Sequence, residues 1–260
     1  MALVGSDAIG VARGVRRTCD GCGVGYKERR RRCPVARMAG AGPNALEGEP
    51  MNVILVNGSP HRRGCTARAL QEVAVPLKDA GIDVVDFWIG SRELGGCKAC
   101  GYCSTAGKCV MEDKVNEFNE LALDADGFVF GSPVYYASMA GQMRSFMDRV
   151  FYSSNDPRRF HMKPAAGISN SRRAGSVTTY DQFNKYFGIS NMLIVSGSYW
   201  NETHGFTPDD VEKDIEGLRT MRAIGLNMAY VLRAKEAAAA AGIQVPERLS
   251  GPSTSFMDGK

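Results

Sequence analysis

Short apolar runs alternate with longer amphipathic segments along the chain from Met51 onward. Five of the runs have the length and β-branched content of strands, and they read NVILVNGSP, IDVVDFW, GFVFGSP, PAAGISN and NMLIVSGS. Segments with apolar residues at helical spacing lie between most of them, and a last amphipathic segment runs from Val211 to Val231. This alternation predicts an α/β fold with a parallel, doubly wound sheet and helices on both faces.

The order of the strands predicts where a ligand binds. Five strands with this spacing favour the flavodoxin-like order 2-1-3-4-5. In such sheets the ligand lies beyond the carboxyl ends of the strands, beside the point where the strand order reverses. We therefore expect a binding site in the loops that follow the first, third and fourth strands.

The first fifty residues differ in composition from the rest of the 260-residue chain. Residues 1–50 hold nine Lys and Arg against five Asp and Glu, whereas residues 51–260 hold 23 of each, so the net charge of +4 comes from the N-terminal segment. That segment is rich in Gly, Ala and Arg and has neither a helical nor a strand period. We expect residues 1–50 to be a disordered extension and residues 51–260 to form one domain with a C-terminal helix.

Composition also excludes several classes of partner. A basic tail on a neutral body is not typical of a nucleic-acid reader, and the chain has no run of about 18 apolar residues that would span a membrane. The positive charges follow the mildly apolar N-terminus, which is the reverse of a secretory signal. We expect a cytoplasmic protein that binds neither nucleic acid nor membrane. Cys19, Cys22 and Cys33 make an incomplete zinc set.

The loop after the first strand, NGSPHRRGCTAR, is the first candidate binding segment. It is neither a Walker A loop nor a dinucleotide fingerprint, because the required Lys and glycines are missing. Its Gly-Ser-Pro is followed by Gly64, Cys65 and Thr66 at the start of a helix, where backbone N–H groups can hold one phosphate. The loop suits a mononucleotide, and a plain turn between strand and helix is the alternative.

Two segments carry a resemblance to a known family. GSPHRRGCT and, about seventy residues later, GSPVYYASMAGQMRSFMDR resemble the NADPH-dependent FMN reductases, which have a flavodoxin-like fold. The resemblance implies that one set of residues surrounds the FMN phosphate: Ser59, Pro60, Gly64, Cys65 and Thr66. It implies that a second set flanks the isoalloxazine ring: Pro133, Val134, Tyr135 and Tyr136.

A third loop, SNSRRAGS, follows the fourth strand. By the same resemblance its residues Ser169, Arg172 and Arg173 contact the cofactor. An arginine there suits the flavin carbonyls or the extra phosphate of NADPH, because a guanidinium fork matches such oxygens. A plain surface charge is the alternative for both arginines.

Four cysteines lie within the stretch CKACGYCSTAGKC, with the spacing C-x2-C-x2-C-x5-C. They are Cys97, Cys100, Cys103 and Cys109. A structural zinc site has two CxxC pairs separated by a dozen or more residues, whereas successive x2 intervals are typical of iron-sulfur ligation. We expect Gly101 and Gly107 to allow the turns and the loop to lie at the active edge of the sheet. The arrangement resembles the iron-sulfur flavoprotein branch of the same family, which binds a 4Fe-4S cluster. Zinc, reduced thiols and a disulfide stay open.

The sequence thus predicts an FMN-dependent oxidoreductase that takes hydride from NADPH or NADH and passes electrons to a small-molecule or protein acceptor. We expect no catalytic side chain, because the cofactor carries the chemistry and the three histidines form no cluster. The alternatives are a non-enzymatic FMN-binding electron carrier or regulatory flavoprotein, and a cluster-free quinone or FMN reductase. Relatives of this kind imply a homodimer or homotetramer.

Overall fold

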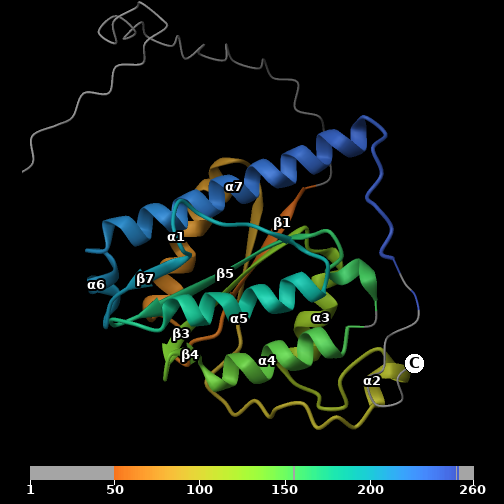
Figure 1. The fold of residues 1–260 in the computed structure, drawn as a ribbon, viewed down its shortest axis with the longest axis horizontal. Coiled ribbons are helices and arrows are strands. Elements are labelled where there is room, and N and C mark those ends of the chain that lie inside the picture. The colour runs from red at the N-terminus through yellow and green to blue at the C-terminus, as the bar shows by residue number, and fades with distance from the viewer. Residues whose placement is uncertain (1–49, 155, 250, 252–260) are drawn as a thin grey trace, which may run out of the picture. The chain divides into compact units, whose positions relative to one another are not determined.

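A parallel sheet with helices on both faces forms the centre of the protein (Figure 1). The computed structural model describes residues 50–154, 156–249 and 251. The prediction of a disordered extension over residues 1–50 therefore lies outside the described residues, apart from Pro50.

The strands and helices alternate as the sequence pattern predicts. The strands are β1 Asn52–Asn57, β2 Asp83–Trp88, β3 Gly127–Tyr135, β4 Ser138–Met139, β5 Pro164–Ser171, β6 Leu193–Ile194 and β7 Glu202–His204. The helices are α1 Cys65–Asp79, α2 Tyr102–Ala106, α3 Lys114–Asp124, α4 Gly141–Tyr152, α5 Ser176–Ile189, α6 Pro208–Val211, α7 Ile215–Ala240 and the 3-10 turn η1 Pro157–Arg159.

The predicted order of five strands is confirmed. The main path of the sheet runs β2-β1-β3-β5-β6, with parallel pairing throughout. The sheet has seven strands instead of five, because β4 pairs antiparallel with β3 and β7 pairs parallel with β5. The fold is flavodoxin-like α/β, as predicted.

The fifth predicted strand is formed only in part, because β6 spans Leu193–Ile194 and β7 lies beyond the predicted run. The chain leaves the edge of β5 after Ile194 and returns to it at Glu202. Asn201 closes this excursion, because its side chain accepts from the Gly197 N–H at 2.9 Å and donates to the Val195 carbonyl at 3.3 Å. The interruption separates β6 from β7 along the same edge.

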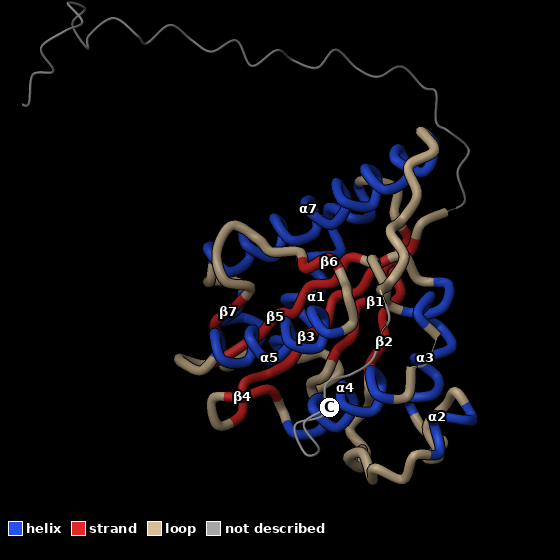
Figure 2. Tube along the Cα trace, turned by 45° about the vertical axis from the view of Figure 1, so that its right-hand side comes forward, coloured by secondary structure: helices blue, strands red, loops and turns tan. Residues whose placement is uncertain are grey.

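Helices lie on both faces of the sheet (Figure 2), and two clusters of buried apolar residues hold them there. Helices α1 and α7 cover one face, where Val73, Ile224 and Met228 are buried. Helices α3, α4 and α5 cover the other face, where a cluster of phenylalanines that includes Phe118 and Phe146 is buried. The methionines of α7, Met221 and Met228, are therefore part of the core. Within the described residues no helix is both long and apolar enough to cross a membrane.

Candidate functional site

The turn between β1 and α1 is held in one shape by Ser59. The backbone N–H of this buried serine donates to Asn57 Oδ1 at 3.0 Å, and its hydroxyl accepts from the N–H of His61 at 3.1 Å. Its carbonyl accepts from Trp88 Nε1 at 2.8 Å. Three contacts on one residue fix the path of the chain into the loop, and Pro60 follows half-buried.

Helix α1 begins directly after this turn with its N-terminus uncapped. Gly64 stands at the N-cap and offers no side chain, and the first turn holds no acidic residue. The first N–H groups of a helix have no partners within the helix, and the dipole makes this end positive. Thr66 is buried, and burial raises the pKa of the half-buried Cys65 thiol, which therefore stays protonated at neutral pH. The start of α1 suits an anion.

A tight hairpin follows β3 and presents two tyrosines. Tyr135 pairs with Ser138, and the two residues between them have positive φ, 51° at Tyr136 and 56° at Ala137. Such a two-residue turn matches the twist of paired strands. Tyr135 is half-exposed and Tyr136 is fully exposed, whereas Pro133 and Val134 are half-buried below them. The hairpin therefore offers aromatic faces at the edge of the sheet.

Of the three residues predicted in the loop after β5, Ser169 instead lies within the strand, which runs to Ser171. Ser169 is buried, and its hydroxyl donates to the Ser176 carbonyl at 3.3 Å, so it serves the turn. Arg172 and Arg173 are exposed. Arg172 lines an open cavity of about 540 Å³, and the other four residues that line it come from β7 and the segment after it. These four are His204, Gly205, Phe206 and Asp210.

The sheet register brings all three loops to one edge. Asn57 lies opposite Gly131, and Pro133 lies opposite Asn170, so β1, β3 and β5 end side by side. The loops also touch, because a Cβ on Gly175 would lie 2.6 Å from the Cα of Ala137. The predicted cofactor residues thus lie at the carboxyl edge where the strand order reverses, and among them the hydroxyls of Ser59 and Ser169 form hydrogen bonds within the fold.

A second cavity of about 840 Å³ lies beside the first loop. Arg62, Arg63, Trp88 and Arg92 are among the residues that line it. The guanidinium carbon of Arg62 lies 5.7 Å from the centre of the Trp88 ring. Sequence reasoning missed Trp88 and the β7–α6 segment, because neither carries a motif and both reach the site only through strand pairing.

The four cysteines surround one small pocket of about 20 Å³, which all of their side chains line. Burial raises the pKa of the Cys103 thiol, and the charges of Cys109, Cys97 and Cys100 act in the same direction. The predicted turns at Gly101 and Gly107 are confirmed, with φ of 71° and 67°, and Ala99 adds a third left-handed residue at 51°. The four cysteines therefore lie around one pocket.

The position of this loop differs from the prediction. We expected it at the active edge of the sheet, yet the pocket is lined by Arg149, Tyr152 and Ser153 from the C-terminal end of α4 and the residue after it. The segment after β2 follows α4 along its length, from Gln142, which donates to the carbonyl of Arg92, to Arg149, which donates to that of Gly95. A helix rises by 1.5 Å per residue, so this pocket at the C-terminal end of α4 lies about 15 Å from the start of the helix.

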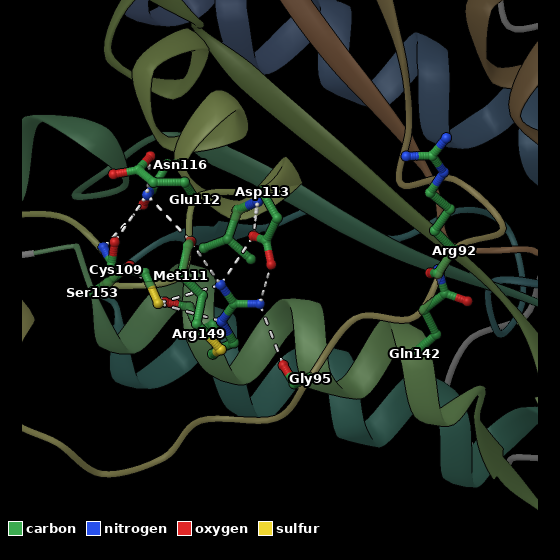
Figure 3. A network of polar contacts seen from close by, with 11 residues as sticks. Arg92, Gly95, Cys109, Met111, Glu112, Asp113, Asn116, Gln142, Arg149 and Ser153 are labelled. Carbon is green, nitrogen blue, oxygen red and sulfur yellow. Dashed lines mark hydrogen bonds and ion pairs between the residues drawn. The ribbon is translucent and has the colours of Figure 1, made fainter.

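Arg149 connects the cysteine loop to the helix layer (Figure 3). Its side chain is fully buried, forms a bidentate ion pair with Asp113 and donates to the sulfur of Cys109. Desolvation alone would lower the pKa of this guanidinium, but the hydrogen bonds that it donates to Asp113 and Cys109 raise it. The group is therefore permanently charged.

The residues present fit an iron-sulfur cluster by donor chemistry. Four thiols are the ligand set that such clusters use, and here they line one pocket. In the part of the chain that the structure describes, no group of three or more His, Cys, Asp or Glu is arranged to hold a metal ion. The fit therefore rests on the ligand chemistry and on the pocket that the four cysteines share.

Comparison with known proteins decides the family. The sequence profile of the NADPH-dependent FMN reductases matches residues 51–207, which is more than half of the chain. The chain belongs to the NADPH-dependent FMN reductase family. The match contains the three loops and the four cysteines.

Within this FMN reductase family the chain falls in the iron-sulfur flavoprotein branch. An iron-sulfur flavoprotein of Methanocaldococcus jannaschii is 31% identical over 194 residues, which cover 70% of this chain and 98% of the relative. One of Methanosarcina thermophila is 26% identical over 185 residues, with 70% and 95% covered. The solved structure of RosB shares the fold with a TM-score of 0.56 at 12% identity, covering 79% of this chain and 92% of RosB.

Membership in the FMN reductase family makes the chain a flavin-dependent oxidoreductase. This agrees with the geometry, because an uncapped helix start and exposed aromatic rings meet at one edge of the sheet.

Proposed function

We propose that the protein binds FMN at the carboxyl edge of its sheet and uses it to carry electrons from NADPH or NADH to a small-molecule or protein acceptor. FMN, when bound, supplies the redox chemistry, because its ring accepts two electrons together and releases them singly. The residues of the protein bind the phosphate, hold the ring and control access to it.

One observation carries the proposal: α1 starts without a cap beside a turn that Ser59 holds rigid. Free N–H groups at a positive helix end attract a phosphate. The site can bind one phosphate group of a mononucleotide, since the loop lacks the lysine of a nucleotide triphosphate site. Cys65 and Thr66 in the first turn add an S–H and an O–H.

The hairpin after β3 is the proposed support for the flavin ring. Tyr135 and Tyr136 offer apolar faces with polar tips, and Pro133 and Val134 form the floor below. Gly175 holds the third loop against this hairpin, because any side chain there would meet Ala137. The third loop and the hairpin are therefore packed directly against each other.

Two groups of exposed arginines are proposed to bind the phosphates of the pyridine nucleotide. Arg62, Arg63 and Arg92 line the cavity of about 840 Å³, and in the described part of the chain none of them has a carboxylate partner. Arg172 and Arg173 form the second group on the third loop. A guanidinium fork suits phosphate oxygens, and several of them near one cavity favour a donor with more than one phosphate.

We also propose that Cys97, Cys100, Cys103 and Cys109 hold one 4Fe-4S cluster, which when bound adds a one-electron centre. The support is the shared pocket, the spacing and the left-handed turns within the loop. Iron and acid-labile sulfide in anaerobically purified protein, and their loss in Cys103→Ser, are the expected results. Zinc in place of iron, or thiols without any metal, would contradict this part of the proposal.

Flavin binding and reduction test the main proposal. Protein freed of cofactor should bind added FMN with quenched flavin fluorescence, and NADPH or NADH should bleach the bound flavin within a second in a stopped-flow instrument. A protein that does not bind added FMN would refute the proposal. Tight FMN binding with very slow reduction by both nucleotides would favour the electron-carrier alternative.

We further propose that the active form is a homodimer or homotetramer. Tyr135, Tyr136 and Phe206 are all exposed near the carboxyl ends of β3 and β7. Exposed aromatic residues gathered near a ligand site are typical of an interface. A second copy of the chain would cover them and shield the flavin from water.

A further inference from the structure

Arg149 is the one fully buried guanidinium that contacts a predicted cluster ligand among the described residues. Its side chain has no exposed surface although it carries a charge. It lies in α4, forty residues after Cys109 in the chain. A buried charge of this kind is costly unless it is paired and hydrogen-bonded.

The guanidinium makes two kinds of contact (Figure 3). Toward the thiols, Nε and Nη2 lie 3.4 and 3.3 Å from the sulfur of Cys109. Away from the thiols, Nη1 and Nη2 lie 2.7 and 2.9 Å from the two carboxylate oxygens of Asp113. The guanidinium therefore stands between one sulfur and one carboxylate.

Cys109 is also held in place by a separate contact. Asn116 accepts from the Cys109 N–H and donates to the Cys109 carbonyl, both at 2.9 Å. These two hydrogen bonds hold the backbone of Cys109, so the position of its sulfur does not depend on Arg149 alone.

We propose that Arg149 is a positioning residue that raises the reduction potential of the iron-sulfur cluster through its hydrogen bonds to Cys109. This inference rests on the proposed cluster and assigns to one residue the control of its potential. Reduction adds one negative charge to the cluster and its thiolates. A positive donor in contact with a ligand sulfur stabilises that added charge, and hydrogen bonds to sulfur are a known lever on cluster potentials.

Asp113 provides a second substitution whose effect on the reduction potential should have the opposite sign. Its carboxylate offsets part of the guanidinium charge from the side opposite the sulfur. Removing Arg149 leaves a negative charge near the cluster, whereas removing the charge of Asp113 leaves the positive charge less compensated. The two changes should therefore move the potential in opposite directions, which a merely structural role of the pair would not do.

The structural alternative is that Arg149 only clamps the loop. It donates to the carbonyls of Gly95 and Met111, at 3.3 and 3.1 Å. Arg159 provides a matched control, because it is also buried and donates to the carbonyls of Asn119 and Gly107 at 3.0 and 3.4 Å. It thus holds the same loop through backbone carbonyls.

The experiment is a redox titration of the cluster, followed by electron paramagnetic resonance, in the full chain purified anaerobically. Four variants are compared with the parent protein after iron and sulfide have been measured in each: Arg149→Gln, Arg149→Lys, Asp113→Asn and Arg159→Gln. Asparagine keeps an N-cap oxygen at the start of α3, so Asp113→Asn spares the cap.

The midpoint potential should shift to more negative values in Arg149→Gln, less so in Arg149→Lys, and to more positive values in Asp113→Asn. Arg159→Gln should shift it by the least. Equal shifts in all four variants, or unchanged potentials in iron-loaded Arg149→Lys and Asp113→Asn, would overturn the inference and leave the cluster proposal intact. A parent protein without iron would overturn both. If Arg149→Gln loses iron, the opposite potential shifts expected for Arg149→Lys and Asp113→Asn still test the inference.

Discussion

At the scale of single residues, the site depends on a close approach of backbones at Gly58. This glycine follows β1, and its N–H donates to the carbonyl of Gly131 at 2.8 Å. A Cβ at this position would lie 2.4 Å from the sulfur of Met143 and 2.7 Å from the Gly131 carbonyl oxygen. The sulfur belongs to a flexible side chain, but the carbonyl is backbone and cannot move aside without disturbing β3.

Gly58→Ala is therefore expected to destabilise the fold by about 1–3 kcal/mol, the usual cost of overpacking. It should also weaken FMN binding, because the turn that is proposed to hold the FMN phosphate begins at this residue. Urea unfolding and an FMN titration measure the two effects. Gly141→Ala is the control, since a Cβ there meets nothing within 4 Å. Equal stability in the two variants would contradict the packing argument.

The arginines of the first loop give a second prediction at this scale. The double substitution of Arg62→Gln and Arg63→Gln should raise KM for NADPH by about tenfold, the loss that corresponds to one charged hydrogen bond. The affinity for FMN should change little, because the backbone at the start of α1 holds its phosphate. Steady-state kinetics with both nucleotides measure the effect. If Arg172→Gln with Arg173→Gln raises KM instead, the third loop binds the donor.

At the scale of secondary-structure elements, α1 and α7 are joined by a buried carboxylate. Glu72 of α1 accepts from Arg68 at 2.7 Å and also from Arg222 of α7. Burial alone would raise the pKa of Glu72, but the hydrogen bonds from Arg222 and Arg68 outweigh it, and the pKa is lowered from its usual value of 4.5. Gly225 brings the two helices into contact, since a Cβ there would meet the Val73 carbonyl at 2.4 Å.

Glu72→Gln is expected to lower the free energy of unfolding at pH 7 by about 2 kcal/mol, within the range for hydrogen bonds to charged groups. A carboxyl whose folded pKa is depressed stabilises the protein above its unfolded pKa and loses this contribution as pH falls through the folded pKa. The parent protein should therefore lose more stability than the variant as the pH falls below about 4.5. Denaturant unfolding at pH 7, 5 and 3 measures the difference, and Glu236→Gln, which removes a surface pair with Arg233, should show none.

The elements also show what the sequence could predict and what it could not. Strand order and the position of three loops at the carboxyl edge follow from local patterns, such as the Gly-Ser-Pro after β1 and β3, and both are confirmed. The place of the cysteine loop was not, because it depends on Arg149, which lies forty residues further along on another helix. The excursion of the chain between β6 and β7 depends on side-chain bonds of Asn201, which no periodicity reveals.

At the scale of the whole molecule, the chain leaves aromatic surface exposed at its functional edge. Tyr136 is held outward by a left-handed turn, where a non-glycine residue is uncommon. Phe206 is 78% exposed in the segment after β7. Both lie next to loops that the fold keeps rigid, so the cost of ordering them on association is small. This arrangement favours the contact between copies of the chain proposed above.

Tyr136→Ser should therefore shift the protein toward monomer. Burying one aromatic side chain contributes about 1.5 kcal/mol or more, and a two-fold interface contains each residue twice. The dissociation constant should rise by about 100-fold, which corresponds to about 3 kcal/mol. Sedimentation over a range of concentrations measures it. Tyr230→Ser is the matched control, because this tyrosine is also exposed but lies on α7. A parent protein that is monomeric at every concentration, or an equal effect of both substitutions, would show that the carboxyl edge is not the interface.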